Sequence, residues 1–289
     1  MKYRVVHNTT YQYATPAEAC HNMVRLSPRT MPGQTCLDTS LAIEPAPPRV
    51  HSHVDYFGNR VHSFAVMEPH ETLSITATGL VQVDRSVSAL AGSPPWNEVP
   101  HHLHHQRDDA TIDALQYVYD SRYIRAGTAL RNFAAPSFPA ERPLLRAVLH
   151  LTTRIFKDFI YDPKATTIDT SVDVVLNRRR GVCQDFAHLE IACLRSLGLA
   201  ARYVSGYLRT KPLPDKPRLA GTDASHAWLS VYCPENGWID FDPTNGCIVV
   251  EDHITLAWGR DYHDVSPVKG IVLGAVGSEM TISVDVAEV

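Results

Sequence analysis

The chain has 289 residues and a net charge of −4, from 27 Lys and Arg against 31 Asp and Glu. With 44% apolar and 20% charged residues, it has the composition of a soluble globular protein of one or two domains. This balance offers no basic surface to nucleic acid, and no apolar run approaches the roughly 18 residues of a membrane helix. We therefore expect no nucleic-acid partner and no membrane association.

The N-terminal residues Met1 to His7 alternate polar and apolar side chains. This pattern is typical of a strand and lacks the continuous apolar stretch of a signal peptide. We therefore expect a cytoplasmic protein. The six cysteines are scattered without a close Cys-x-x-Cys pair, so disulfides are not expected in a reducing compartment.

Residues 1–88 show the two-residue period of antiparallel strands and no pattern of helix length. Leu37, Leu41 and Ile43 fall on one face of a predicted strand that ends at Pro45. The residues 57–59 separate two further strand-like runs, as a hairpin turn would. We interpret this region as a small antiparallel β-sandwich domain.

Residues 89–108 are rich in Ser, Gly and Pro and contain a histidine cluster from His101 to His105. We interpret this segment as a linker. The histidines could bind a metal, but no second ligand group follows at zinc-site spacing, and the chain contains no EF-hand loop. The sequence therefore predicts a solvated loop here and no metal site.

Residues 109–289 change to helical spacing and then return to strands. Apolar residues from Leu144 to Phe159 predict a long helix with Pro143 in its first turn. The broad apolar surface from Cys183 to Leu197 predicts a central, buried helix. Four strands are expected to follow, over residues 201–208, 226–233, 238–242 and 280–286. Helices followed by an antiparallel sheet indicate an α+β domain.

Cys183 lies where the central helix begins. Free backbone N–H groups and the positive end of the helix dipole stabilise a thiolate at such a position. Taken alone, a buried structural cysteine is the commoner occupant of a helix end. The interpretation of Cys183 as a nucleophile therefore depends on a base nearby.

His226 and Asp242 offer a base and a carboxylate that orients it. Residues 234–237 predict a hairpin turn between their strands. If all four residues form the loop, Asp242 lies opposite Leu229, whose side chain points away from the face of His226. A Cys-His-Asp triad therefore requires a β-bulge or a loop of odd length before Asp242. Asp240 is the rival carboxylate, but the sharp end of the strand at Asp242 favours the latter.

Four runs of sequence, in this order, resemble the bacterial transglutaminase-like superfamily. They are residues 180–188 (RGVCQDFAH), 197–207 (LGLAARYVSGY), 225–228 (SHAW) and 237–246 (GWIDFDPTNG). Residues 258–267 (WGRDYHDVSP) and the N-terminal DYFGN run are similar to the same group. The resemblance implies a papain-like transglutaminase core, in which a cysteine begins a helix that packs on the antiparallel sheet carrying the histidine and the aspartate.

By motif position, the resemblance implies that Cys183 is the nucleophile, His226 the base and Asp242 the group that orients the base. The catalytic domain would then span residues 109–289. Gln184 and Asp185 follow the nucleophile, and we expect them to support the site or the oxyanion. Three aromatic residues are candidates for a substrate groove, although each also fits a core position: Tyr161, Tyr207 and Trp228.

The resemblance implies an enzyme that works on amide bonds through a thioester and needs no cofactor. Its substrate would be a peptide or protein amide, either a glutamine-like side chain or a peptide bond. Attack on the thioester by water gives hydrolysis, and attack by an amine gives transamidation; both outcomes stay open. The alternative is a catalytically silent module of the same fold that binds peptides in its groove.

Overall fold

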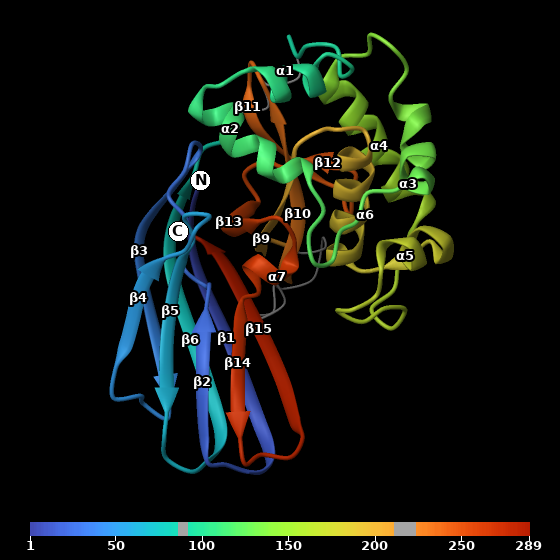
Figure 1. Ribbon diagram of the computed structural model, residues 1–289. Coiled ribbons are helices and arrows are strands. Elements are labelled where there is room, and N and C mark those ends of the chain that lie inside the picture. The colour runs from blue at the N-terminus through green and yellow to red at the C-terminus, as the bar shows by residue number, and fades with distance from the viewer. Residues whose placement is uncertain (86–91, 211–223) are drawn as a thin grey trace, which may run out of the picture.

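The computed structural model describes residues 1–85, 92–210 and 224–289 of the chain. It shows two regions, a β-sandwich and a helical region built around a third sheet (Figure 1). Both chain ends lie at the sandwich, where Tyr3 pairs with Glu288. Among the described helices, none combines the length and the apolar character needed to cross a bilayer.

The sandwich consists of two four-stranded antiparallel sheets, with the orders β15-β1-β6-β3 and β14-β2-β5-β4. Alternate residues of its strands are apolar and buried, as Val5, Leu73 and Val286 are, which is the two-residue period of a sandwich core. The expected β-sandwich is therefore present. Its strands are β1 (Lys2–Ala17), β2 (Ala19–Val24), β3 (Gln34–Glu44), β4 (Val50–Val54), β5 (Arg60–Val66), β6 (His70–Val83), β14 (Val268–Leu273) and β15 (Ser278–Glu288).

Two strands from the C-terminal end complete the sandwich, and they correct the predicted division at residues 1–88, 89–108 and 109–289. β15 pairs with β1 from Tyr3↔Glu288 to Tyr13↔Ser278, and β14 pairs with β2. The alternation in this segment correctly predicts a strand. It cannot assign the strand to a sheet, because the side-chain period is the same in every sheet. The last two strands therefore belong with the N-terminal region.

The second region contains a five-stranded antiparallel sheet with the order β12-β11-β10-β9-β13. Helices cover this sheet (Figure 1), which is the expected α+β arrangement. The strands are β9 (Ala201–Leu208), β10 (Ala224–Cys233), β11 (Gly237–Asp242), β12 (Cys247–Ile248) and β13 (His253–Gly259), and a short parallel pair is formed by β7 (Ile160–Tyr161) and β8 (Arg180–Gly181). The helices are α1 (Val99–His105), α2 (Asp109–Leu115), α3 (Thr128–Ala134), α4 (Leu144–Asp158), α5 (Val172–Arg178), α6 (Cys183–Ser196) and α7 (Tyr262–Val265).

The histidine-rich part of the expected linker is helical, which corrects the predicted solvated loop. Val99 and Leu103 of α1 are four residues apart and buried, so this short helix packs through one face. On its exposed side, the rings of His101 and His105 stack with their centroids 3.9 Å apart. The apolar face of only two residues, hidden among histidines, is too weak a periodic signal to reveal the helix.

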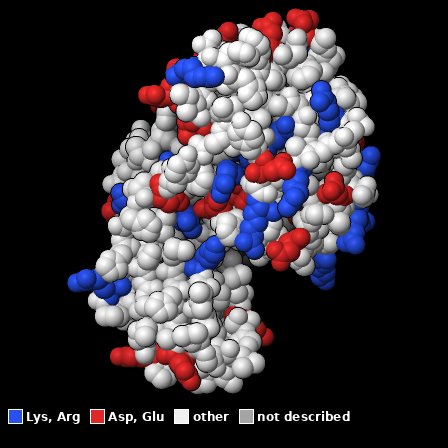
Figure 2. Space-filling model, viewed as in Figure 1, with Lys and Arg blue, Asp and Glu red and all other residues white. Residues whose placement is uncertain are grey.

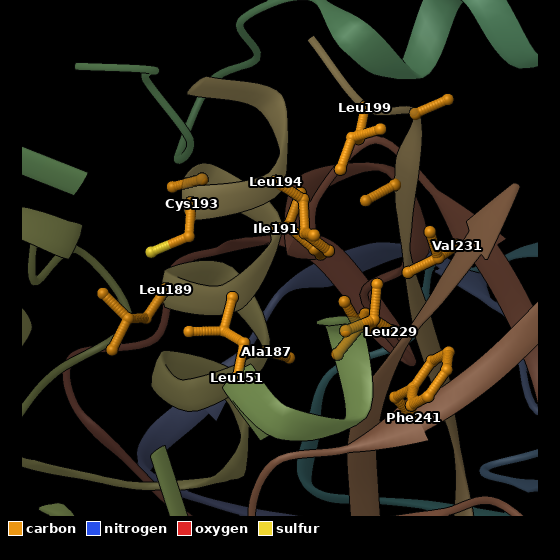
Figure 3. Packing of buried hydrophobic residues seen from close by; sticks show 14 of the residues in the cluster. Leu151, Ala187, Leu189, Ile191, Cys193, Leu194, Leu199, Leu229, Val231 and Phe241 are labelled. Atoms are coloured by element: carbon orange, nitrogen blue, oxygen red, sulfur yellow. The ribbon is translucent and has the colours of Figure 1, made fainter. Parts of the chain in front are cut away.

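The core of the second region surrounds α6. Figure 3 shows Ile191 and Leu194 pointing toward Leu229 of β10, while Leu189 and Cys193 point away from that strand. All five side chains are buried. A helix that is apolar on more than one side lies inside the protein, and each buried Leu or Ile contributes about 1.5–3 kcal/mol. This packing holds the start of α6 in a fixed position against the sheet.

One carboxyl group lies within this core. Glu190 of α6 is buried and hydrogen-bonds through Oε1 to the hydroxyl of Thr152 of α4 at 2.6 Å, while Oε2 has no partner. Burial raises the pKa of Glu190 to about 8, against the smaller opposing effect of the Thr152 hydrogen bond. Glu190 is therefore protonated at neutral pH.

We predict that Glu190→Gln stabilises the protein at alkaline pH. Protonated Glu190 contributes to the free energy of unfolding. This contribution is fully present below the ordinary carboxyl pKa of about 4.3 and is lost as the pH rises through the folded-state pKa of about 8. An amide does not ionise, so the variant has no such loss. Thermal unfolding at pH 5, 7 and 9 should show the variant melting higher than wild type at pH 9, by about 2–4 °C for each kcal/mol. The difference should shrink toward pH 5. Exposed Glu279→Gln is the control, and a difference independent of pH would contradict the prediction.

Candidate active site

Cys183 is the first residue of α6, and its neighbours hold the start of this helix. Val182 has an extended backbone, and its N–H donates to Asp185 Oδ2 at 2.8 Å. The same oxygen accepts from the Thr166 hydroxyl at 2.6 Å. A Cβ at Gly181 would lie 2.6 Å from Asp185 Oδ2, so this approach requires glycine. Asp185 therefore supports the helix start, and half-buried Cys183 lies at the positive end of a 14-residue helix.

A loop of three residues joins β10 to β11 and decides the face on which Asp242 lies. The ladder between the two strands leaves only residues 234–236 outside it, and Gly237 has a φ of 70°, as a turn closed by a left-handed residue requires. The odd length shifts the register by one residue. Asp242 therefore continues the ladder opposite Trp228, on the face of His226. The expected odd-length loop is present.

The Asp242 carboxylate is fully buried, and both of its oxygens accept hydrogen bonds. Oδ2 accepts from His226 Nε2 at 2.7 Å, His253 Nε2 at 3.0 Å and Asn245 Nδ2 at 2.6 Å. Oδ1 accepts from the backbone N–H groups of Thr244 at 2.9 Å and Asn245 at 3.2 Å. Burial alone would raise the pKa of Asp242, but the hydrogen bonds and charges of the two histidines hold it well below its usual range.

His226 shows the matching shift. The residue is 7% exposed, and this burial alone would lower its pKa. The hydrogen bond to Asp242 and the interaction with the neighbouring Cys183 sulfur outweigh burial and raise the pKa of His226 to about 10. His226 is therefore an imidazolium at neutral pH. Because Nε2 donates to Asp242, Nδ1 is the ring nitrogen left for another partner.

His253 is a second histidine on the same carboxylate, and the sequence analysis missed it. It begins β13, which reaches the site by pairing with β9. The His253 ring also lies edge-on to Trp228, with centroids 5.2 Å apart, and 6.0 Å from the ring of His226. No spacing in the sequence relates His253 to Asp242, because their proximity results from pairing between strands that are distant in the chain.

The two histidines and Asp242 also have a spacing that could hold a metal ion, since one potential ligand atom from each lies within 4.8 Å of the others. Both imidazoles, however, contact one carboxylate oxygen at 2.7 and 3.0 Å. These are the distances of N–H···O hydrogen bonds. We therefore interpret the three residues as a hydrogen-bonded group.

Cys183 and His226 line one cleft of about 240 Å³. One side of the cleft is formed by the start of α6 and by β9 and β10, and the other by β1 and β15 of the sandwich. The structure therefore brings the sulfur and the imidazole to one accessible hollow, with the carboxylate buried behind the imidazole. The lining residues are His7, Thr9, Tyr11, Val182, Cys183, Gln184, Tyr203, Ser205, Ser225, His226, Ala227, Tyr262, Pro267, Val268, Met280 and Ile282.

The three aromatic residues expected in a groove do not line this cleft. Tyr161 is 55% exposed outside it, and Tyr207 and Trp228 are buried in two separate parts of the core. Strands β9 and β10 are covered on both faces, so their period does not show which aromatic side chain reaches the cleft. Tyr203 and Tyr262 take this place instead.

Two further candidate site residues, Gln184 and Asp240, form hydrogen bonds with partners other than His226. Gln184 lines the cleft, and its Nε2 donates to the Ile168 carbonyl at 3.4 Å, so its amide is directed to the backbone. Asp240, the rival carboxylate, accepts from Trp228 Nε1 at 3.1 Å. The structure therefore joins Asp242 and not Asp240 to His226.

We predict that Asp242→Asn destabilises the protein far more than Asp240→Asn. The first change removes a buried charge that two histidines require, which costs about 3–5 kcal/mol. The second leaves an amide oxygen that can accept from the Trp228 indole on β10, and it removes only a half-buried charge that favours the guanidinium groups of Arg85 and Arg202, which costs about 1 kcal/mol. Urea unfolding at pH 7 measures both. Equal losses in the two variants would show that the buried carboxylate is not the stabilising centre described here.

Comparisons with known proteins find two matching family models and several relatives. Residues 3–82 match the family model of the bacterial transglutaminase-like N-terminal region, and residues 131–243 match that of the transglutaminase-like superfamily. An uncharacterized protein of Mycobacterium tuberculosis is 41% identical over 290 residues, which cover 99% of this chain and 92% of that protein. A protein-glutamine gamma-glutamyltransferase of Pseudomonas aeruginosa is 36% identical over 84 residues, 28% of this chain and 12% of that protein.

One solved structure has a similar fold. It is the crystal structure of a protein from Cytophaga hutchinsonii, described as a candidate cysteine protease, with a TM-score of 0.76 and 24% sequence identity. The match covers 100% of this chain and 91% of that one. It therefore includes the sandwich as well as the helical region.

Proposed function

Because this chain belongs to the transglutaminase-like superfamily, we propose that it is a cysteine-dependent enzyme that acts on amide bonds through a thioester. One observation carries the proposal. His226 lines the cleft together with Cys183, and behind it the buried Asp242 binds the same imidazole at 2.7 Å. The names of the Pseudomonas and Cytophaga proteins refer to transfer of a gamma-glutamyl group from protein glutamine and to cysteine proteolysis, and both reactions take place at an amide carbonyl.

The first step forms the nucleophile. In the free enzyme at neutral pH, the nitrogen of His226 that Asp242 leaves unbound has already taken the proton of the Cys183 thiol, so the site holds a thiolate and an imidazolium. Asp242 holds the ring in one orientation and stabilises its positive charge. The helix dipole of α6 stabilises the thiolate. The raised pKa of His226, about 10, supports this ion pair at neutral pH.

The second step breaks the amide. The thiolate attacks the carbonyl carbon, and the C–O double bond opens to an oxyanion. The backbone N–H of Cys183 at the start of α6 is placed to donate to this oxyanion. When the oxyanion collapses, the C–N bond breaks, the nitrogen takes the proton of the His226 imidazolium, and ammonia or an amine leaves. The acyl group remains on Cys183 as a thioester.

The third step regenerates the enzyme. Water or an amine gives a proton to neutral His226 and attacks the thioester carbonyl, and the C–S bond breaks to restore the thiolate. Water yields a carboxylic acid and an amine yields a new amide. Which of the two enters depends on how the cleft excludes water. Asp185 takes no part in these steps, because its carboxylate already accepts from the Val182 N–H and the Thr166 hydroxyl, which fix the start of the helix.

We predict that iodoacetamide alkylates Cys183 rapidly even at pH 6. A cysteine of ordinary acidity is almost entirely a thiol there, whereas a thiolate paired with an imidazolium keeps its reactivity. Cys36 is a suitable internal control because it is also a free, half-buried cysteine. Peptide mass spectrometry should show labelling of Cys183 at least tenfold faster than that of Cys36 at pH 6.

The same experiment separates the enzyme from a catalytically silent binding module. His226→Ala should reduce the labelling of Cys183 at pH 6 to the rate of Cys36 and leave Cys36 unchanged. A rate at Cys183 that rises with pH as an ordinary thiol does, and that ignores His226, would favour the silent module. Turnover is then measured by ammonia release from glutamine peptides, with and without an added amine.

A further inference from the structure

Part of the cleft wall belongs to the sandwich. Here the inner face of the sheet that contains β1 and β15 is left uncovered by the rest of the sandwich. Met280 of β15 pairs with Tyr11 of β1, and Ile282 pairs with Thr9. Residues directly opposite in a ladder share one face, and all four line the cleft. We define the β1–β15 wall as Thr9, Tyr11, Met280 and Ile282. It presents the apolar side chains of Met280 and Ile282 and the phenol ring of Tyr11 to the site of Cys183.

The exposure of the wall changes along β15. Val284 and Val286 lie on the same face as Met280 and are buried in the sandwich core. Met280 is 56% exposed and Ile282 is 47% exposed. One face of β15 is therefore buried in the sandwich core at Val284 and Val286 and lines the cleft at Met280 and Ile282. In Figure 2, the charged side chains of the sandwich are few and lie at its edges and far end, whereas both signs gather over the helical region.

The part of the cleft that the structure describes also lacks a partner for a charged group. Among the described lining residues there is no Asp, Glu, Lys or Arg. His7 is buried, and burial lowers its pKa to about 4, so it is neutral at pH 7. The imidazolium of His226 is already bound to Asp242. A charged side chain that entered would lose its water without gaining a counter-ion, which is costly.

We propose that the β1–β15 wall is a specificity site that selects amides whose neighbouring side chain is apolar and uncharged. This inference rests on the proposed function, because it places the neighbouring side chain beside a carbonyl held at Cys183. The cleft volume of about 240 Å³ is below the roughly 300–1,000 Å³ of pockets that enclose a whole drug-sized ligand. It suits one side chain. The sandwich is then part of the substrate site and not only an appendage of the catalytic region.

The test uses three peptidyl chloromethyl ketones that differ only in the residue next to the reactive carbon, which is Leu, Asp or Lys. Each probe alkylates Cys183 when the Cys183 sulfur displaces the chloride of the probe. The rate of labelling is measured by mass spectrometry for wild type, Met280→Glu and Met280→Lys. Thr281→Glu and Thr281→Lys are the controls, because Thr281 is exposed on the same strand but on its other face. Exposed positions on a strand tolerate such changes in folding.

In wild type, the Leu probe should react at least tenfold faster than the two charged probes. Met280→Lys should raise the rate of the Asp probe relative to the Lys probe about tenfold, and Met280→Glu should reverse this ratio. The Thr281 variants should match wild type. Equal reaction of the three probes with wild type, or equal shifts in the Thr281 and Met280 variants, would overturn the inference while leaving the proposed function intact. Failure of every probe to label Cys183 would overturn both.

Discussion

The arrangement of the site depends on a negative charge that is kept inside the protein. Asp242 has no exposed surface, yet three side chains and two backbone N–H groups hold its oxygens. A buried charge without such partners costs several kcal/mol. Every element that supplies a donor is therefore held against the end of β11 by the same requirement: the turn that follows β11, the start of β10 and the start of β13. The orientation of the His226 ring is one consequence of this requirement.

The nucleophile is positioned independently of that charge. α6 is fixed by the core that surrounds it, and its first turn is closed by Asp185 and Gly181. The sulfur at the helix start then meets the imidazole at the cleft. Two rigid units, each stabilised by its own interactions, thus bring one reactive group each to a common hollow. Such preorganisation lets the groups react without a costly rearrangement. The sandwich completes the hollow from the opposite side.

The local parts of this site could be predicted from the sequence, and the distant ones could not. The helix start at Cys183 follows from apolar spacing, whereas counting residues between His226 and Asp242 shows only that a triad needs a bulge or a loop of odd length between their strands. Even there, the exact loop needed the left-handed Gly237 to decide between three and four residues. The resemblance to known sequences supplied the roles that spacing alone leaves open.

The predictions that failed have three physical causes. His253, β14 and β15 reach their positions by pairing with strands far away in the chain, and a two-residue period contains no information about the partner strand. The choice of Tyr207 and Trp228 as groove residues failed because β9 and β10 are covered on both faces. The helix α1 was missed because only two of its residues are buried.

The central claim is that His226 is a charged partner of Asp242 and of the sulfur of Cys183, and nitrogen NMR of the labelled imidazole tests it most directly. The account predicts that both ring nitrogens of His226 carry protons at pH 7, that the ring titrates near pH 10, and that Cys183→Ala moves this titration to lower pH. A neutral ring at pH 7, with one protonated nitrogen and a titration that does not respond to Cys183→Ala, would contradict it.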